Sequence, residues 1–393
     1  MHIPHRMQFL QHLAQTSPEP LLLEIESAQG HYLYGSSGKK YLDLISGISV
    51  SSFGHQHPHI IQAAEKQLHR HMHIMVYGEL VQSAQTEFAT ALTSRLGALD
   101  TCYFTNSGSE AIEGAMKLAK RYTGKHGFVA QTQAYHGSTQ GPLSLMSNEY
   151  FSDAYKPLLP DIVFIEQNSI SDIENLPSET AAVVIELVQA EKGCYPSTVE
   201  FVHALRDWCT ANRTLLIIDE NQTGMGRTGT LFAFEQYEVM PDILVCGKAL
   251  GGGMPLGAFL APGHIMSVLS VQPVLGHITT FGGHPVSCAT GLAALELYTH
   301  NYDVKHKEQL FRQRLVHPFI REVRGSGLLL AVELDSDSRC KNVIKKCLEY
   351  GLFTDWFLFA PQCLRIAPPL SITIDEIEQA CGIILRVLNE EFI

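Results

Sequence analysis

The sequence predicts an α/β fold: a large domain with a mostly parallel sheet covered by helices, followed by a smaller α+β domain. Three observations lead to this prediction. The chain has 393 residues, too many for one minimal domain and few for three. Short apolar runs alternate with amphipathic helical patterns along its middle, as in sheets whose parallel strands are connected by helices. After about residue 300 this alternation gives way to a mixed pattern.

The composition is that of an ordinary globular protein. Hydrophobic residues make up 45% of the chain and charged residues 17%, which excludes a disordered or fibrous chain. The net charge of −12 argues against nucleic acid and anionic membranes as partners, although a helix N-terminus or one arginine can still bind a small anion. The nine cysteines form no C-x-x-C pair, and the sequence shows no leader-like or membrane-spanning apolar run. We therefore expect a cytoplasmic protein with reduced thiols.

The chain divides into three expected parts. Residues 1–50 are expected to join the small domain, residues 51–300 to form the large domain and residues 301–393 the small one. The first part contains a hairpin-like pattern at 21–27 and 31–44, with glycines at its bends. Helical patterns follow at 58–74 and 79–96.

Within the expected large domain, several apolar runs have the length of buried strands: 101–104, 127–131, 161–165, 181–188, 215–219 and 242–245. Amphipathic patterns predict helices at 110–122 and 198–212, and a long helix opened by Pro285 at 284–300. In the last part we expect a strand at 328–333 and helices at 338–350 and 375–391.

A first stretch with chemical potential follows the run at 101–104. Small residues between Thr105 and Ser109 precede a predicted helix, so backbone N–H groups there would point at an anion that the helix dipole helps to hold. An ordinary helix cap made by Ser107 or Ser109 explains the same residues. The sequence alone leaves both interpretations open.

A second stretch combines a buried strand with carboxylates. The aliphatic residues 215–218 lead directly into Asp219 and Glu220, at the place where open α/β sheets bind ligands. Acidic residues are common after any strand, but the added Gln222 and the glycine-rich loop favour a functional role. The loop GMGRTG at 224–229 matches the dinucleotide fingerprint by letter. It neither follows the strand directly nor opens a long helix, which argues against a nicotinamide site.

A third stretch contains one lysine, and the histidines raise the question of a metal. Lys248 follows the run at 242–245 and precedes three glycines, where partial burial would favour the neutral, nucleophilic amine; a surface lysine beside a flexible loop is the alternative. His69 and His73 have helical spacing, but no cysteine or carboxylate completes a zinc pattern near them. We therefore expect no metal site.

Together these stretches resemble the class III family of pyridoxal-phosphate-dependent aminotransferases, which have the aspartate-aminotransferase-like fold (fold type I). The resemblance runs from about Tyr32 to Leu370. Its motifs occur in the family's order: GHxHP from residue 54, NSGSEA from 106, YHG from 135, ELVQAE from 186, LLIIDENQTGMGRTG from 215, PDILVCGKALGGGMPLGA from 241, HITTFGGHP from 277 and RIAPPL from 365.

The resemblance implies an enzyme that moves an amino group between an amino donor and a 2-oxo acid (2-oxoglutarate or pyruvate) by a ping-pong cycle. In this reading Lys248 forms a Schiff base with pyridoxal 5'-phosphate and moves the proton between substrate and cofactor. Asp219 faces the ring nitrogen and keeps the ring protonated, which makes the ring an electron sink. Gln222 lies near the phenolic oxygen and Tyr135 stacks on the ring. The remaining cofactor-binding residues that the resemblance implies are Ser107, Gly108 and Ser109 at the phosphate, Glu186, and Thr280 from the neighbouring subunit of a homodimer.

Arg365 and Glu191 resemble the family's switch pair. Arg365 would bind the α-carboxylate of glutamate or 2-oxoglutarate, and Glu191 would neutralise it when another donor is bound. Some positions depart from the usual pattern, among them Asn221, Leu187, Gly247 and His284.

The most informative departure is Ser138, which directly follows the YHG motif. Ornithine, acetylornithine and 4-aminobutyrate transaminases resemble one another in having arginine there, where it binds the donor's carboxylate. Because a serine cannot do so, these three donors are expected to be poor substrates.

Other classes of function are weighed against this reading. A racemase, aminomutase or decarboxylase of the same fold would share Lys248 and Asp219 and differ on the substrate side. A non-catalytic cofactor-binding or regulatory domain is disfavoured because Lys248, Asp219 and Gln222 are intact and no DNA-binding pattern accompanies them. A nicotinamide dehydrogenase is disfavoured by the context of the GMGRTG loop.

Overall fold

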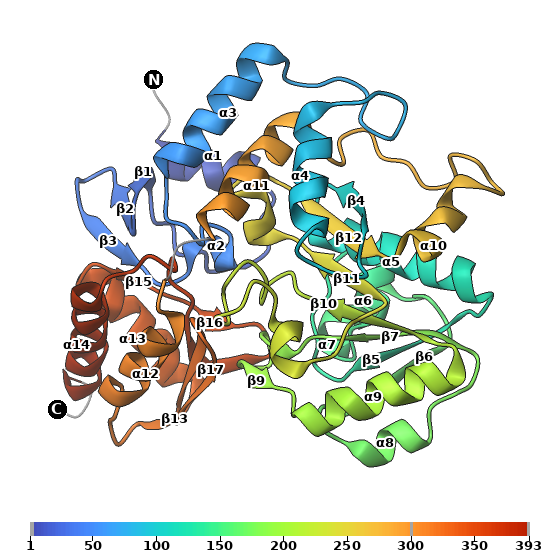
Figure 1. Ribbon diagram of the computed structural model, residues 1–393. Coiled ribbons are helices and arrows are strands. Elements are labelled where there is room, and N and C mark those ends of the chain that lie inside the picture. Colours follow the sequence, from blue (N-terminus) through green and yellow to red (C-terminus); the bar gives the residue numbers. More distant parts are fainter. Residues whose placement is uncertain (1–3, 299–301, 391–393) are drawn as a thin grey trace.

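The computed structural model describes residues 4–298 and 302–390 (Figure 1). Its centre is a seven-stranded sheet in which β12 runs antiparallel to both neighbours and the other pairings are parallel. In spatial order the strands are β4 (Thr101–Thr105), β12 (Gly257–Ala261), β11 (Ile243–Cys246), β10 (Leu215–Asp219), β7 (Thr180–Ile185), β5 (Gly127–Gln131) and β6 (Ile162–Ile165). The mostly parallel sheet expected from the alternating pattern is confirmed.

Both faces of this sheet are buried. In β10, Leu215 and Ile217 pack in one apolar cluster with helix α5 (Gly108–Thr123), while Leu216 and Ile218 pack in another with helix α9 (Val199–Asn212). Side chains alternate across a strand, so a strand covered on both faces must be apolar throughout. The α9 cluster extends to three further helices: α3 (Pro58–Arg70), α4 (Ser83–Thr93) and α11 (Pro285–Leu297).

A second sheet lies in the C-terminal part of the chain. It has the order β13 (Ile320–Ser326), β14 (Leu329–Leu334), β17 (Ala360–Ile366) and β16 (Trp356–Phe357). Its helices are α12 (Val304–Arg314), α13 (Asp337–Glu349) and α14 (Ile374–Glu390).

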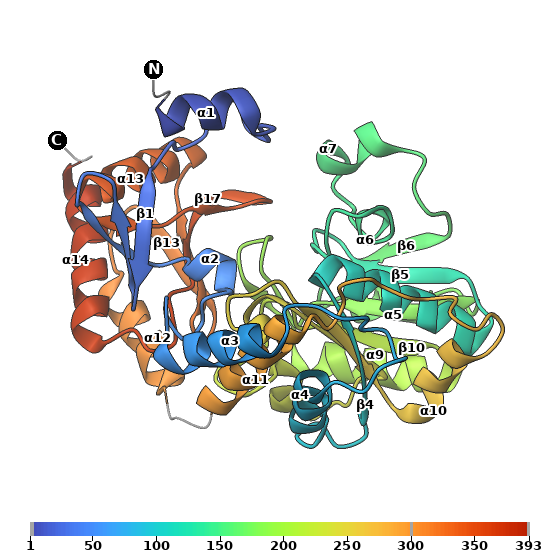
Figure 2. The same cartoon turned by 90° about the horizontal axis from the view of Figure 1, so that it is seen from above.

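The N-terminal strands join this C-terminal part. β1 (Ile25–Gln29), β2 (Tyr32–Gly35) and β3 (Lys40–Asp43) form a sheet whose fourth strand is β15 (Leu352–Phe353), parallel to β3. Figures 1 and 2 both place these strands beside α12–α14. The pairing supports our proposal that residues 1–50 belong with residues 301–393 rather than with residues 51–300.

Several boundaries differ from those expected. The helix expected at 58–74 ends at Arg70, where His71 turns to extended backbone and Gln67 Nε2 donates to the His71 carbonyl. The helix expected at 79–96 covers Ser83–Thr93 alone, and the expected hairpin has three strands. The predicted ends at residues 300 and 391 fall outside the described residues.

The short elements are α1 (His5–His12), α2 (Ser46–Ser49), α6 (Gln140–Ser144), α7 (Glu149–Ser152), α8 (Ile170–Glu174), α10 (Gly263–Met266), β8 (Val188–Gln189) and β9 (Tyr195–Pro196).

Across residues 4–298 and 302–390, none of the helices combines the length and the apolar character that crossing a membrane requires. The cysteines are free thiols, and Cys102 alone among them is not fully buried.

Candidate active site

The carboxyl edge of the seven-stranded sheet gathers most of the candidate residues. Parallel strands end at the same edge, so the residues that follow them are neighbours. At this edge Ser107–Ser109 follow β4, Tyr135 follows β5 and Glu186 follows β7. Asp219 is the last residue of β10, with Gln222 in the loop after it, and Lys248 follows β11.

Asp219 is held by a buried histidine. Its Oδ2 accepts a hydrogen bond from His136 Nδ1 at 2.7 Å, and its Oδ1 accepts one from the Asn221 backbone N–H at 2.9 Å. Burial by itself lowers the pKa of His136, but the hydrogen bond to Asp219 and its negative charge outweigh burial and raise that pKa. Asp219 is only 4% exposed, so the two groups form a buried pair.

Glu186 lies beside this pair. One of its carboxylate oxygens accepts a hydrogen bond from the Tyr135 backbone N–H at 3.1 Å. Burial raises the pKa of Glu186 to about 7; the charges of His136 and Lys248 oppose this rise and that of Asp219 adds to it. The four ionisable groups therefore act on one another electrostatically within a single cluster.

Lys248 is partly buried and stands on strained backbone. It begins the turn after β11 with φ +49, a conformation that non-glycine residues rarely adopt. Burial alone raises the pKa of Glu191, but Arg365 lowers it below its usual value, and the positive charge of Lys248 adds to this lowering. Among the described residues none is hydrogen-bonded to its amine, so the amine is available to a ligand.

The N-terminus of α5 is capped and still has free donors. Ser107 Oγ accepts a hydrogen bond from the Glu110 N–H at 3.2 Å, so Ser107 is the cap, while Ser109 Oγ pairs with Thr139 Oγ1 at 2.6 Å. The N–H groups of Gly108 and Ser109, first in the helix, have no acceptor within it. The cap and the anion site are thus compatible with each other.

Several buried polar atoms near this edge have no hydrogen-bond partner within the described residues, among them His136 Nε2, Gln222 Oε1 and Asn221 Oδ1. Buried polar groups are rarely left unpaired in folded proteins, so their presence in one place indicates a polar ligand. Asn221 also lies against the glycines of two neighbouring loops. A Cβ atom added at Gly108 or at Gly247 would come within 2.4 Å of Asn221 Oδ1.

Glu220 does not belong to the site, which corrects the functional interpretation of the Asp219–Glu220 pair. Its carboxylate accepts hydrogen bonds from Thr223 Oγ1 at 2.6 Å and from the N–H groups of Ala233 and Phe234 at 2.9 and 2.7 Å. It therefore fixes the loop after β10. Arg227, in the GMGRTG loop, is fully buried and donates to the Leu328 carbonyl at 3.0 Å, so this loop also has a structural role.

Arg365 and Glu191 are brought together as expected. Two parallel hydrogen bonds of 3.1 Å join Arg365 Nη1 and Nη2 to the two carboxylate oxygens of Glu191. Arg365 also donates from Nε to Asp355 Oδ1 at 2.9 Å.

Two further expected residues are Tyr135 and Thr280, of which Tyr135 is partly buried. The Tyr135 hydroxyl is hydrogen-bonded to Ser138 Oγ at 2.9 Å, and Ser138 is exposed. Thr280 is also exposed; the adjacent Thr279 accepts a hydrogen bond from Asn106 at 3.3 Å.

The sequence analysis gave no role to His136 or Asp355. His136 stood in the YHG motif, so its position next to Tyr135 was a signal. Asp355 had no signal, because it reaches Arg365 only through the pairing of β16 with β17.

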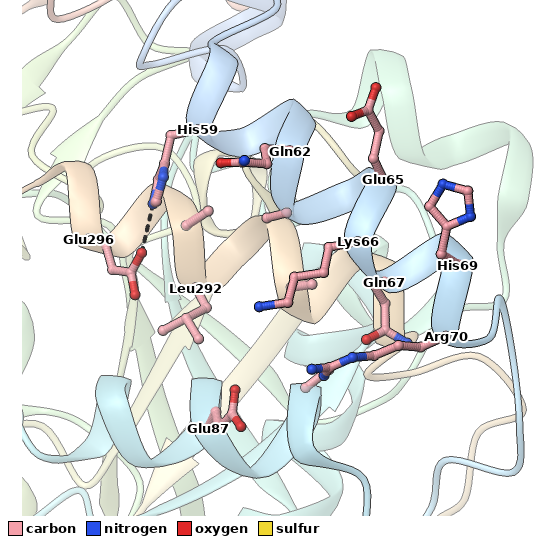
Figure 3. A pocket seen from close by; sticks show the side chains of 14 residues that line it. His59, Gln62, Glu65, Lys66, Gln67, His69, Arg70, Glu87, Leu292 and Glu296 are labelled. Atoms are coloured by element: carbon pink, nitrogen blue, oxygen red, sulfur yellow. Dashed lines mark hydrogen bonds and ion pairs between the residues drawn. The ribbon is translucent and has the colours of Figure 1, made fainter.

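A separate pocket lies between α3, α4 and α11, with a volume of about 630 Å³ (Figure 3). His59 Nε2 is hydrogen-bonded to Glu296 Oε2 at 2.7 Å in its lining, and Lys66, Arg70 and Glu87 also line it. It contains none of the candidate residues, and its charges of both signs favour no ligand class.

Comparisons with known proteins show the family of the chain. The family model described as aminotransferase class-III matches residues 13–388. An acetylornithine aminotransferase of Clostridium acetobutylicum is 36% identical over 374 residues, covering 91% of this chain and 94% of its own length. One from Archaeoglobus fulgidus is 36% identical over 379 residues, covering 95% and 98%.

Solved structures have the same fold. The ornithine aminotransferase of Toxoplasma gondii superposes with a TM-score of 0.89 at 27% identity, over 98% of this chain and 95% of that one. A transaminase from the marine bacterium Virgibacillus gives a TM-score of 0.91 at 22% identity, over 98% of each chain. The chain therefore belongs to the class III aminotransferases and is a pyridoxal-phosphate-dependent aminotransferase.

Proposed function

We propose that this aminotransferase passes an amino group to a 2-oxo acid whose α-carboxylate is bound by Arg365. The donor in this proposal is an amine whose far end needs no arginine at position 138. The observation that carries the proposal is the Arg365–Glu191 pair, which presents the end of a guanidinium to the same cluster that contains Lys248.

The residues at the sheet edge fit the cofactor. The free N–H groups at the start of α5 suit a phosphate, and the strand-end carboxylate of Asp219 suits a protonated ring nitrogen. The unpaired Gln222 Oε1 and His136 Nε2 supply further polar contacts. When bound, pyridoxal phosphate supplies a ring that takes up the electrons released as the substrate carbon loses its proton.

The protein's own groups divide the remaining work. We assign to Lys248 the covalent attachment of the cofactor and the movement of the proton at the substrate carbon. Asp219, hydrogen-bonded to His136, would hold the proton on the ring nitrogen. Glu186 accepts a hydrogen bond from the Tyr135 backbone N–H and interacts electrostatically with Lys248, so it belongs to the same cluster.

Arg365 selects for a carboxylate next to the reacting carbon. A bidentate guanidinium–carboxylate contact has the geometry that Glu191 shows, so a substrate carboxylate can replace Glu191 one for one. When the donor has no carboxylate there, Glu191 stays on Arg365 and leaves no buried charge unpaired.

The alternative donor is acetylornithine, for which the relatives in Clostridium acetobutylicum and Archaeoglobus fulgidus are named. Their overall identity favours it, whereas Ser138 argues against it. A matrix of amine donors against 2-oxoglutarate and pyruvate, followed by the absorbance of the cofactor, decides between the two. Fastest turnover of acetylornithine would overturn our proposal for the donor while leaving that for Arg365 standing.

We further propose a homodimer with shared active sites. Large apolar side chains are exposed on two segments, residues 72–81 and 271–281, with Val81 93% and Val274 71% exposed. A groove of about 580 Å³ lies between parts of these segments. Exposed apolar surface of this extent favours a protein partner, and Thr280 belongs to the second segment.

Mixing two inactive variants tests the shared site. If Thr280 serves the neighbouring subunit, Lys248→Ala and Thr280→Ala subunits will regain activity when mixed, because one hybrid site then has both residues intact. Sedimentation of the parent as a monomer would contradict the dimer.

A further inference from the structure

Arg365 has a carboxylate on each of two edges. Glu191 occupies the end of the guanidinium with hydrogen bonds of 3.1 Å to Nη1 and Nη2. Asp355 occupies the Nε edge at 2.9 Å. A substrate carboxylate needs the end that Glu191 holds, and it does not need the edge that Asp355 holds.

The restraints on the Nε edge come from the same hairpin as Arg365. Asp355 directly precedes β16, and its carbonyl accepts a hydrogen bond from the Arg365 backbone N–H at 2.9 Å. The Trp356 carbonyl accepts from Arg365 Nη2 at 3.2 Å, and the guanidinium carbon lies 4.2 Å from the centre of the Phe357 ring. These contacts hold the guanidinium plane whether or not Glu191 is present, because Glu191 lies on a different segment, after β8.

We propose that Asp355 is a positioning residue for substrate carboxylates: it keeps the guanidinium of Arg365 in place when Glu191 leaves and a 2-oxo acid takes its position. This inference rests on the proposed role of Arg365. An arginine that is already oriented loses less conformational freedom on binding, so the acceptor binds more tightly. Without the Asp355 carboxylate, the Trp356 carbonyl and the Phe357 ring are the restraints that remain on this side, so the guanidinium is freer to follow Glu191 or to rotate about its last torsions.

The charge of Asp355 has the opposite effect on affinity. The negative charge of Asp355 partly neutralises the positive charge of Arg365, which attracts the substrate carboxylate. The charged groups that face Asp355 are Arg365 on β17, Glu191 after β8 and Asp43 at the end of β3. Burial raises the pKa of Asp355 to about 6, against the effect of Arg365 and with those of Glu191 and Asp43. As the pH falls through this value, Asp355 becomes neutral and the acceptor should bind more tightly.

Two variants separate orientation from charge. Asp355→Asn keeps an oxygen for Arg365 Nε and removes the charge, whereas Asp355→Ala removes both. We expect Asp355→Ala to raise the KM for 2-oxoglutarate and for pyruvate on the order of 10-fold, with the KM for a donor amine lacking a carboxylate changed by less than about twofold. Asp355→Asn should keep the acceptor KM at or below the parent value and remove its change around pH 6.

A matched control exists on the surface of the same region. Asp335 accepts from Arg339 Nε at 2.7 Å, and Arg339 lies over the ring of Phe319, so the pair has the same chemistry away from the cluster. Asp335→Ala should leave both KM values unchanged. If Asp355→Ala fails to fold, the pH profile of Asp355→Asn decides alone: a persisting step around pH 6 contradicts the proposal.

Arg365→Met distinguishes this inference from the proposed function on which it rests. If Arg365→Met leaves the acceptor KM unchanged, the role of Arg365 itself is wrong. If Arg365→Met raises that KM but Asp355→Ala does not, or raises the KM for acceptor and donor alike, the role of Asp355 alone is wrong.

Discussion

His136 donates a hydrogen bond from Nδ1 to Asp219 Oδ2 over 2.7 Å, and both side chains are buried. The pair joins the loop after β5 to the end of β10 across the strand β7 that lies between them in the sheet. In the role that we propose for Asp219, its ability to hold a proton on the cofactor ring depends on this contact with a neighbouring histidine.

His136→Phe is expected to lower kcat on the order of 10-fold to 100-fold, the range found when a residue that hydrogen-bonds to a functional side chain and orients it is lost. His136→Asn, which retains a donor, should recover part of the rate. His59→Asn is the control, since His59 also pairs with a carboxylate at 2.7 Å but is exposed. Steady-state kinetics check this; a parental rate in His136→Phe would mean that Asp219 works without the pair.

Lys248→Ala is expected to bind pyridoxal phosphate and to lose turnover, because no other described amine follows β11 at the sheet edge. Borohydride reduction followed by mass spectrometry should add the cofactor mass to the parent and to Lys66→Ala, but not to Lys248→Ala. Near-normal turnover, or a cofactor adduct on another residue, would contradict the assignment.

Asp219→Asn is expected to fold and bind the cofactor but to lose on the order of 10²–10⁴ in rate, since a charge partner is removed from a buried site. Glu220→Gln is the neighbouring control and should keep a rate within a few-fold of the parent, because Glu220 bonds to its own loop. Equal losses in the two variants would mean that loop disruption, and not the charge at 219, explains the effect.

Glu220→Gln should instead change how stability depends on pH. Burial raises the pKa of Glu220 to about 7 from 4.5, against the donors on Thr223, Ala233 and Phe234. A carboxyl with a raised pKa stabilises the fold fully below its unfolded value and loses that contribution as the pH rises through the folded value. Between about pH 5 and about pH 7.5 the parent should therefore lose up to ~3 kcal/mol relative to Glu220→Gln. Thermal midpoints of both proteins across this range measure the difference; parallel curves would contradict the prediction.

The strands and their ends could be predicted from the sequence, and the partners at those ends only in part. The run 215–218 is apolar throughout because both faces of β10 are covered, and Asp219 follows it at the carboxyl end of the strand. The true role of Glu220 could not be predicted, since its partners Ala233 and Phe234 return through a loop with no regular pattern. The early end of α3 at Arg70 had no glycine or proline to announce it.

The last prediction concerns the amino donor. Ser138 is exposed and its hydroxyl is hydrogen-bonded to the Tyr135 hydroxyl at 2.9 Å, so a neutral hydroxyl stands at the position where the resembling transaminases have arginine. With Glu191 on Arg365, a donor carboxylate brought to this position would lose water without gaining a charged partner, which costs several kcal/mol when the loss is complete. Ornithine, acetylornithine and 4-aminobutyrate should therefore be poorer donors than amines without a carboxylate at that end. Ser138→Arg should improve the three carboxylate donors and leave the others nearly unchanged, while Ser147→Arg, at a serine whose hydroxyl accepts a hydrogen bond from the Gln133 N–H, serves as the control for added charge. If 4-aminobutyrate or ornithine reacts faster in the parent than every amine lacking that carboxylate, the argument from Ser138 is wrong.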